Sequence, residues 1–337
     1  MGREGKVVLA HGGGGRLSHD LVRDRMVGVW GDEVLARLDD AGLVEVGASR
    51  LAFTTDSYVV KPLFFPGGDI GKLAVCGTVN DLAVMGAEPL YISCGLIVEE
   101  GLALEVLDRI VASMGEVAKA AGVRIVTGDT KVVERGSADQ MFVNTSGIGL
   151  VEAQMDFSME RIEVGDRIVV SGTLGDHGMA VLSAREELHF EGSVESDCAA
   201  LNGLIARMME ASSGIRFMRD PTRGGLATTL NEIVEGKDFG IVVVEEALPI
   251  RDPVRGLCEL LGLDPLYVAN EGKVVAVVAP EEAEAVMEAM RSHPLGREAR
   301  VIGTVERTWK GRVGMKTVVG GTRVVDMLVG DQLPRIC

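Results

Sequence analysis

The first half of the chain alternates apolar and polar stretches in a way that predicts a mixture of strands and helices. Residues 51–55 alternate like a half-buried strand. Residues 73–87 are apolar or glycine except for Thr78, Asn80 and Asp81, and this pattern predicts a buried helix that carries a polar patch. The other predicted elements of this half are an amphipathic helix over 104–118, with apolar residues every three or four positions, and strands over 90–98, 124–127 and 141–150.

The second half repeats this alternation without a regular strand–helix–strand rhythm, which favours an α+β fold over a doubly wound sheet. Because a segment of mixed charge and turn residues precedes a strand predicted at 167–170, we place a domain boundary there. The predicted division is an N-terminal domain of residues 1–155, a C-terminal domain of residues 156–328 and a mobile tail of residues 329–337. The predicted C-terminal elements are helices near 197–210, after Asp220 and over 281–291, and strands at 241–244, 273–279 and in short pieces to about residue 328.

Composition and charge narrow the class of protein. A chain of 337 residues with 47% hydrophobic residues is long enough for two domains with real cores. Its 34 basic residues against 50 acidic ones give a net charge of −16, which argues against nucleic acid as a main partner. No apolar run has the length of a membrane span, and the N-terminus lacks the apolar core of a signal peptide. We therefore expect a cytoplasmic protein without a membrane partner.

The abundance of glycine, 44 residues, directs attention to nucleotide-binding loops, but neither common loop motif is present. The stretch from Gly67 to Lys72 resembles a P-loop, yet Pro66 and Leu73 stand where that motif needs glycine and a hydroxyl residue. The glycine run at 12–15 lacks the spacing of a dinucleotide fingerprint. The five cysteines contain no C-x-x-C pair, so they predict neither a zinc site nor a disulfide framework.

Four aspartates stand at element ends or in apolar surroundings, namely Asp56, Asp81, Asp129 and Asp220. Two carboxylates about 4 Å apart repel by roughly 4 kcal/mol at an effective dielectric of 20. If these groups converge, they need a cation, and oxygen ligands suit Mg²⁺, which often joins carboxylates to nucleotide phosphates. Lys72 and Lys131 could balance phosphate charge.

Each of these residues also has a purely structural interpretation. Asp220 precedes proline and could cap a helix. Asp56, Asp129 and Glu271 could be turn residues. Asp81 is the hardest to explain by structure alone, because a carboxylate buried without partners costs several kcal/mol. Taken singly, the residues indicate a site for Mg²⁺ and phosphate and no more.

Cys337 is the last residue and follows a segment without periodicity. Prenylation is excluded, because that signal places cysteine four residues from the end. One interpretation is a disordered chain end. The other is a tethered carrier, on which a partner loads an activated acyl group before the tail folds back for chemistry. In an exposed tail, the thiol pKa is expected near the ordinary value of about 8.5.

Taken together, these motifs resemble the HypE family of hydrogenase maturation proteins over essentially the full length. Several of them are shared more loosely with aminoimidazole ribonucleotide synthetase, selenophosphate synthetase and thiamine-monophosphate kinase, whereas the ending Pro-Arg-Ile-Cys separates HypE from these relatives. The matching segments are 11–15 (HGGGG), 54–58 (TTDSY), 68–83 (GDIGKLAVCGTVNDLA), 128–131 (GDTK), 219–225 (RDPTRGG), 270–272 (NEG) and 334–337 (PRIC).

The resemblance implies an N-terminal domain that binds ATP and dimerises through its sheet. It implies that a carbamoyltransferase, HypF, loads a carbamoyl group on Cys337, that ATP drives its dehydration to a thiocyanate, and that the cyano group passes to HypC and HypD for the iron of [NiFe]-hydrogenase.

The resemblance also assigns roles to residues. Lys131 and Glu271 are expected to handle protons, with either one as the base, and Cys337 to carry the substrate. Mg²⁺ or phosphate-site residues are expected at Asp56, Asp81, Asp129 and Asp220, and nucleotide contacts at Lys72, Thr78, Asn80, Thr130, Gly224 and Gly225.

Two other functions stay open from the residues alone. One is an ATP-dependent synthetase or kinase of the same superfamily that acts on a soluble small molecule, with Cys337 incidental. The other is a non-catalytic carrier that presents the thiol to partners.

Overall fold

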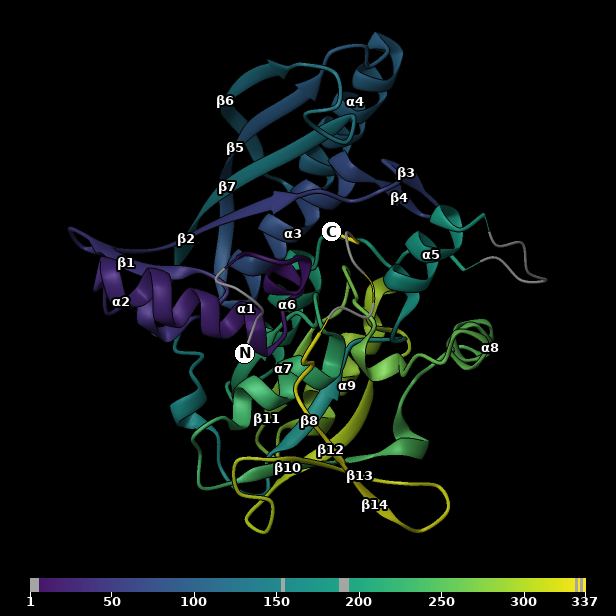
Figure 1. Ribbon diagram of the computed structural model, residues 1–337. Helices are drawn as coiled ribbons and strands as arrows, with labels where there is room; N and C mark the ends of the chain where they lie inside the picture. The colour runs from purple at the N-terminus through teal and green to yellow at the C-terminus, as the bar shows by residue number, and fades with distance from the viewer. Residues whose placement is uncertain (1–5, 153–154, 188–193, 331–332, 334–335) are drawn as a thin grey trace.

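The computed structural model describes residues 6–152, 155–187, 194–330, 333 and 336–337. These residues form two large sheets, each covered by helices, and one two-stranded ribbon, and the predicted α+β class is confirmed. Figure 1 shows the N-terminal sheet in the upper half of the molecule and the C-terminal sheet in the lower half, with the chain end between them. The first sheet ends at Val151 and the second begins at Arg167, while the exact domain limits stay a prediction.

The N-terminal sheet has five strands in the order β1-β2-β7-β5-β6. All neighbours are antiparallel except β5 and β6, which run parallel and are joined by helix α4. The strands are β1 (Gly42–Val46), β2 (Ser49–Tyr58), β5 (Ala87–Glu99), β6 (Arg124–Val133) and β7 (Met141–Val151), and the helices on them are α3 (Ile70–Val84) and α4 (Leu104–Ala121). A separate two-stranded ribbon is formed by β3 (Phe64–Phe65) and β4 (Gly68–Asp69).

Helix α3 is the buried centre of the molecule. Asp69 caps its N-terminus by accepting from the backbone N–H groups of Gly71 and Lys72. Thirteen of its fifteen residues are buried, because it packs on the first sheet on one side and on α6 of the other domain on the other. The buried helix predicted at 73–87 is therefore confirmed, although it begins and ends three residues earlier.

The C-terminal sheet has seven strands in the order β14-β13-β10-β12-β8-β11-β9. Its strands are β8 (Arg167–Val170), β9 (Ile215–Arg219), β10 (Gly240–Val244), β11 (Val275–Val278), β12 (Arg300–Glu306), β13 (Val313–Lys316) and β14 (Thr322–Val325). Its helices are α5 (Asp176–Arg185), α6 (Asn202–Ala211), α7 (Gly225–Val234), α8 (Asp252–Leu261) and α9 (Ala283–Ser292). Before the first sheet, the chain forms short helical segments that include α1 (Arg16–Leu21) and α2 (Gly28–Trp30).

The largest difference from the predicted elements is the length of β6. The pattern predicts a strand over 124–127 followed by a turn, but β6 runs from Arg124 to Val133 and contains the whole Gly-Asp-Thr-Lys segment. It continues because it pairs with β5 along this length, and Gly128 lies against the strand where a Cβ atom would be 2.2 Å from the Cys94 carbonyl oxygen. The interpretation of Asp129 as a turn residue is therefore wrong.

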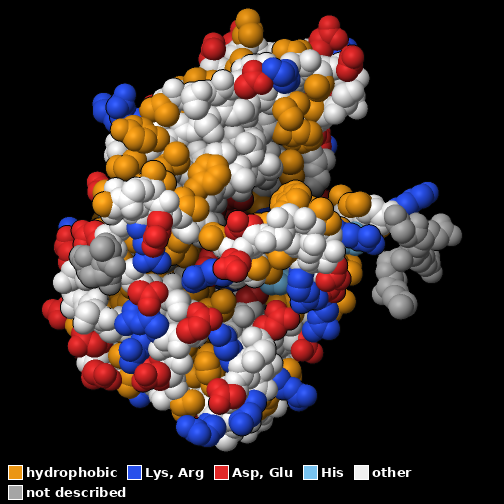
Figure 2. All heavy atoms as spheres, turned by 90° about the vertical axis from the view of Figure 1, so that its left-hand side faces the viewer, with side chains coloured by type: hydrophobic (Ala, Val, Ile, Leu, Met, Phe, Trp, Pro, Cys, Tyr) orange, Lys and Arg blue, Asp and Glu red, His pale blue; other side chains and the backbone are white. Residues whose placement is uncertain are grey.

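One face of the N-terminal sheet is exposed and partly apolar. Phe53, Ile148 and Tyr91 are paired across three neighbouring strands and are 50%, 38% and 42% exposed. Paired residues share a face, so Lys131, which pairs with Ile97 of β5, points to the same side. Figure 2 shows this side of the molecule: the upper half carries hydrophobic side chains with few charges, whereas the lower half is densely charged. Exposed apolar side chains on neighbouring strands are typical of a surface that contacts another protein chain.

Within the residues that the structure describes, no helix is both long enough and apolar enough to cross a membrane.

The two last residues of the chain are packed into the molecule. Ile336 is only 5% exposed and belongs to the same hydrophobic cluster as Phe65 of the N-terminal domain and Val181 of α5. A main-chain carboxylate oxygen of the terminal residue Cys337 accepts from the backbone N–H of Val59 (3.1 Å), just after β2. The preceding tail residues 331–332 and 334–335, including the Pro-Arg of the ending motif, lie outside the described residues, and mobility of the tail stays a prediction.

Candidate active site

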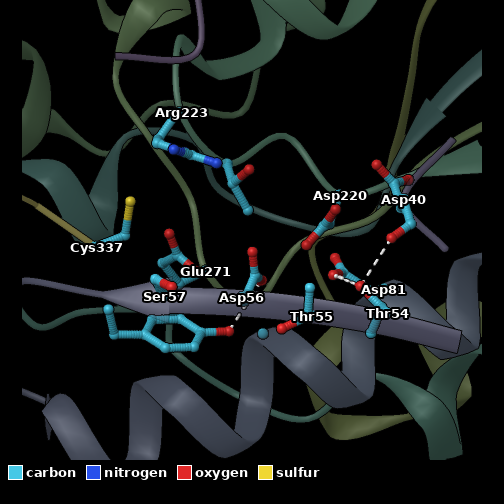
Figure 3. A pocket seen from close by; sticks show the side chains of 13 residues that line it. Asp40, Thr54, Thr55, Asp56, Ser57, Asp81, Asp220, Arg223, Glu271 and Cys337 are labelled. Atoms are coloured by element: carbon cyan, nitrogen blue, oxygen red, sulfur yellow. Dashed lines mark hydrogen bonds between the residues drawn. The ribbon is translucent and has the colours of Figure 1, made fainter. Parts of the chain in front are cut away.

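A cavity of about 210 Å³ lies between the two domains and contains both acidic side chains and the terminal thiol. Figure 3 shows strand β2 crossing it, with three aspartates at one end, Cys337 and Arg223 at the other, and Asp56 and Glu271 between them. The lining residues are Asp40, Thr54, Thr55, Asp56, Ser57, Tyr58, Gly77, Asp81, Asp220, Thr222, Arg223, Glu271 and Cys337. Three of the four predicted metal ligands and two of the three predicted catalytic residues therefore share one cavity.

The aspartates at one end of the cavity come from separate parts of the fold. Asp81 lies on α3 and accepts from Thr54 Oγ1 of β2 (2.8 Å), whereas Asp220 follows β9. Removal from water, together with the nearby Asp56 carboxylate, raises the pKa of Asp81 well above its usual range. The pKa of Asp220 is raised well above its usual range by burial and by nearby Asp40. Clustered acids of this kind gain from a bound cation.

Asp220 does not cap the helix that follows it. The cap of helix α7 is Gly224, four residues further on, so the interpretation of Asp220 as a helix cap is wrong. Its Oδ2 atom is buried without a hydrogen-bond partner, and such an oxygen is stabilised by a cation or a proton. Among the described residues, no three acidic, histidine or cysteine side chains lie close enough together to hold a metal ion by themselves. Mg²⁺ commonly takes only one or two carboxylates from a protein and completes its shell with water and substrate phosphates.

Asp40 is a site residue that the sequence patterns do not reveal. Arg219 fixes it by a hydrogen bond from Nε to Oδ1 (2.8 Å) and is itself held by Glu232 (2.9 Å). Desolvation raises the pKa of Asp40 to about 6 despite this arginine. The sequence shows only a pair of aspartates, Asp39 and Asp40, before the first strand, and such pairs are common in turns.

The other end of the cavity holds the thiol. Burial raises the pKa of Cys337 to about 12, against the opposing effect of the nearby Arg223 guanidinium. The expectation of an ordinary thiol pKa is therefore wrong for the packed chain end. Arg223 also donates to the Gly12 carbonyl oxygen (3.1 Å), and Gly14 lies where a Cβ atom would be 2.5 Å from Arg223 Cβ. The N-terminal glycine run thus supports the arginine that faces the thiol.

Glu271 lies near Cys337 and is 3% exposed. Burial, with added repulsion from Asp220, raises its pKa well above the usual range, and its Oε1 atom has no partner. Its backbone is fixed from two sides: Asn80 Nδ2 donates to the Glu271 carbonyl oxygen (3.4 Å), and Glu271 N donates to Asp197 Oδ1 (3.2 Å). Asp197 is paired with buried Lys273 (3.0 Å). The main chain is held while the carboxyl group stays available for proton transfer.

Several predicted site residues do not reach this cavity within one chain. Asp129, Thr130 and Lys131 lie on β6, where Lys131 donates to Asp129 (2.6 Å) and this bond lowers the pKa of Asp129. Strand β6 is three strands from β2, roughly 14 Å at ~4.8 Å per strand, which is further than a lysine side chain extends. The turn-residue interpretation of Asp56 is also wrong, since Asp56 lies within β2.

Other predicted nucleotide contacts have protein partners instead. Lys72 donates to the Gly67 carbonyl oxygen (2.8 Å), Thr78 is hydrogen-bonded to Thr145, and Asn80 joins the two domains. Gly224 and Gly225 lie at the start of α7, directly after the lining residues Thr222 and Arg223. Contacts of these residues with a nucleotide stay predictions.

We expect Gly77→Ala to destabilise the protein by about 1–3 kcal/mol through overpacking. A Cβ atom at Gly77 would lie 2.2 Å from Tyr58 Oη, which donates to Asp56 Oδ2 (3.0 Å), so the substitution would also displace Asp56. Urea unfolding measures the effect. The control is Gly256→Ala on helix α8, where no atom lies within 4 Å of the new Cβ and the better helix propensity should stabilise by up to about 1 kcal/mol. Equal stability of the two variants would contradict this packing.

The fold and the acidic cavity between two domains define the class of protein. Two family models match this chain: the AIR synthase related protein, N-terminal domain, over residues 38–151, and the AIR synthase related protein, C-terminal domain, over residues 163–316. The chain is also 55% identical to the carbamoyl dehydratase HypE of Bradyrhizobium diazoefficiens, over 99% of this chain and 97% of that protein. It belongs to the HypE family, the carbamoyl dehydratases of hydrogenase maturation, and this prediction is confirmed.

Solved structures agree with this assignment. A HypE in a HypE–HypF complex is 48% identical, with a TM-score of 0.87 over 91% of this chain and 99% of that one. A HypE in complex with ATP is also 48% identical, with a TM-score of 0.83 over 98% of this chain and all of that one.

Proposed function

We propose that this chain dehydrates a carbamoyl group on its own Cys337 to a thiocyanate, at the expense of ATP that binds in the cavity between its domains. The observation that carries the proposal is the presence of the chain's own terminal thiol in the same cavity as Asp56, Asp81, Asp220 and Glu271. A thiol that only carried a group to a partner would gain nothing from burial beside these acids. The structure of a HypE with ATP supports the choice of nucleotide.

The chemistry explains why ATP is needed. The carbamoyl oxygen is a poor leaving group until it attacks the terminal phosphoryl group of ATP and ADP departs. The carbon–oxygen bond then breaks, phosphate leaves, and the nitrogen loses two protons overall to give the thiocyanate. Glu271 suits a role in proton transfer, because its Oε1 atom is unpartnered and its raised pKa makes the carboxylate a stronger base once its own proton has left.

Asp81, Asp220 and Asp40 lie at the far end of the cavity from Cys337, and Asp56 lies between the two ends. One or two of these carboxylates would hold a Mg²⁺ ion, and water and phosphate oxygens would complete its shell. When bound, the ion would neutralise charge on the phosphates, as in other phosphoryl transfers. The same carboxylates would bind the phosphates of the nucleotide through the ion, and Arg223 supplies a positive charge at the end of the cavity where Cys337 lies.

A second copy of the chain completes the site in this proposal. Thr55 and Ser57 line the cavity and also belong to the exposed sheet face, where they pair with Ser146 and Asn144 of β7. The cavity therefore borders the apolar face on which Lys131 lies. Packing of two such faces would bury the exposed apolar residues and place the Lys131 of one copy at the cavity of the other. This arrangement supplies the predicted Lys131–Glu271 combination that one chain lacks.

Mixing two inactive variants tests the shared site. We expect carbamoylated Lys131→Ala and Glu271→Gln chains to regain activity when allowed to exchange subunits, because a mixed dimer contains one cavity with an intact Glu271 and an intact Lys131 across the interface. Random exchange makes roughly a quarter of all cavities intact. Intact-mass analysis counts the dehydrated chains. Lys131→Ala mixed with Lys131→Ala, Glu271→Gln is the control, and no gain in the first mixture would place Lys131 in its own chain's site or outside the reaction.

Partners follow from the same chemistry. HypF, which is present with HypE in a solved complex, is proposed to load Cys337, and HypC with HypD to accept the cyano group. Both transfers take place on the thiol, so both require the chain end to leave the cavity.

Intact-mass analysis of the carbamoylated chain before and after addition of ATP and Mg²⁺ is the direct test. We expect the loss of one water that depends on Cys337 and on both additions. Full turnover of a soluble small molecule by a chain lacking Ile336 and Cys337 would instead favour the synthetase or kinase, and a carbamoylated chain that keeps its mass under these conditions would favour the non-catalytic carrier.

A further inference from the structure

A buried histidine contacts the chain end. His177 lies in the first turn of α5, is completely buried, and packs edge-on against Phe65 with ring centroids 5.4 Å apart. Its Nε2 atom is 2.7 Å from the Ile336 carbonyl oxygen, and its Nδ1 atom is 2.8 Å from Ser196 Oγ. The histidine does not line the cavity as described, so the chemistry proposed above gives it no task.

The partners of His177 fix its proton. A carbonyl oxygen only accepts, so Nε2 must donate to Ile336 and Nδ1 must accept from the Ser196 hydroxyl in the neutral ring. Ser196 Oγ in turn accepts from the backbone N–H of Cys198 (3.1 Å), which leaves its proton for the histidine. Burial lowers the pKa of His177, against the effect of the Asp197 carboxylate, and so favours this neutral form.

The contact is one of two that hold the backbone next to the reacting sulfur. His177 donates to the carbonyl oxygen of Ile336, and Val59 N–H donates to a terminal carboxylate oxygen of Cys337. Between them, the Ile336 side chain is buried in the cluster that joins the domains. A thiol held in this position is near Glu271 and half-buried, and burial raises its pKa to about 12, which favours the protonated form. Loading and dehydration thus need opposite positions of the chain end.

We propose that His177, oriented by Ser196, is a positioning residue that holds the chain end in the cavity and thereby sets the balance between loading of Cys337 and dehydration. The inference rests on the proposed function and names the residue that regulates access to its site. It predicts that loss of the hydrogen bond changes the two steps in opposite directions.

Three variants test this. His177→Phe keeps an aromatic ring beside Phe65 but cannot donate, so alkylation of Cys337 by iodoacetamide should become faster by about five- to tenfold and single-turnover dehydration slower by a similar factor. His177→Gln retains an amide donor and should restore both rates toward those of the wild type. Ser196→Ala removes the group that orients the ring and should give a smaller change of the same sign. His293→Gln, at a histidine that accepts from the backbone N–H of Leu295 and does not line the cavity, is the control and should change neither rate.

The readouts separate positioning from damage to the fold. Alkylation is mapped by mass spectrometry at each cysteine, so a partly unfolded variant would also react at the buried Cys76 and Cys198. Equal alkylation of Cys337 in wild type and His177→Phe, a fall of both rates together, or failure of glutamine to restore what phenylalanine loses would each overturn the inference. Alkylation needs neither ATP nor a carbamoyl group. If the wild-type chain fails to lose water, the proposed function fails, while the alkylation rates still decide the role of His177.

Discussion

Cys337→Ala is expected to abolish dehydration completely and to leave ATP binding within about twofold of the wild type. The reason is that the thiol carries the substrate, whereas the aspartates proposed to bind the nucleotide lie at the opposite end of the cavity. Intact-mass analysis after incubation with the carbamoyl donor system and ATP measures the first effect, and calorimetric titration with ATP and Mg²⁺ measures the second.

The matched control is Cys94→Ala, which removes a half-buried thiol from β5 and should leave loading and dehydration intact. Loss of ATP binding together with dehydration in Cys337→Ala would show that the packed chain end is a structural wall of the cavity. Adduct formation on a chain that lacks Cys337 would place the substrate on another group.

Glu271→Gln should slow dehydration by roughly a hundred- to ten-thousandfold, the range that general acid–base catalysis contributes. Glutamine has the same shape and keeps the backbone contacts with Asn80 and Asp197, but it cannot accept the proton from the carbamoyl nitrogen. Loading of Cys337 and ATP binding should persist. Single-turnover kinetics of the pre-loaded chain measure the rate.

The substitution also removes a buried carboxyl group with an unpartnered oxygen, so its thermal stability should equal or exceed that of the wild type. A slow variant that is also less stable would indicate a general disturbance of the site. Glu259→Gln, at an exposed position of helix α8, should change neither rate nor stability. Unchanged dehydration by Glu271→Gln would assign the base to Lys131 or to another group.

Local patterns predicted the buried helix and most strands because a buried element shows a run or an alternation of apolar residues in the sequence. The apolar run around Asp81 indicated a buried helix, and a carboxylate inside such a helix needs a hydrogen-bond partner or a cation. Helices α5 and α8 were not predicted, although they are as long as the predicted helices α6, α7 and α9, and α5 begins with the polar pair Asp176 and His177. Asp176 accepts from the nearby Thr173 and from the distant Arg251, whereas both partners of His177 are distant in sequence.

The site itself was predictable in its residue types and less so in its assembly. Asp56, Asp81, Asp220, Glu271 and Cys337 share a cavity as the family resemblance implied. Asp40 and His177 were missed because the residues that they contact, Arg219 and Ile336, are far away in sequence. For Lys131, no pattern within one chain could show that β6 is an edge strand whose outer face is available to a second copy.

The position of Asn80 has a consequence for motion. Its amide group donates to Ala199 and accepts from Leu201 across the domain boundary, deep inside a helix that both domains enclose. The two halves of the molecule are thus fastened together at their centre, and a hinge that opened and shut the cavity would have to break these bonds. Water must then be excluded from the cavity without domain closure. The buried side chain of Ile336, next to the terminal cysteine, is suited to close the cavity. The same movement of the chain end that brings the carbamoylated Cys337 into the cavity would therefore also close the cavity to water.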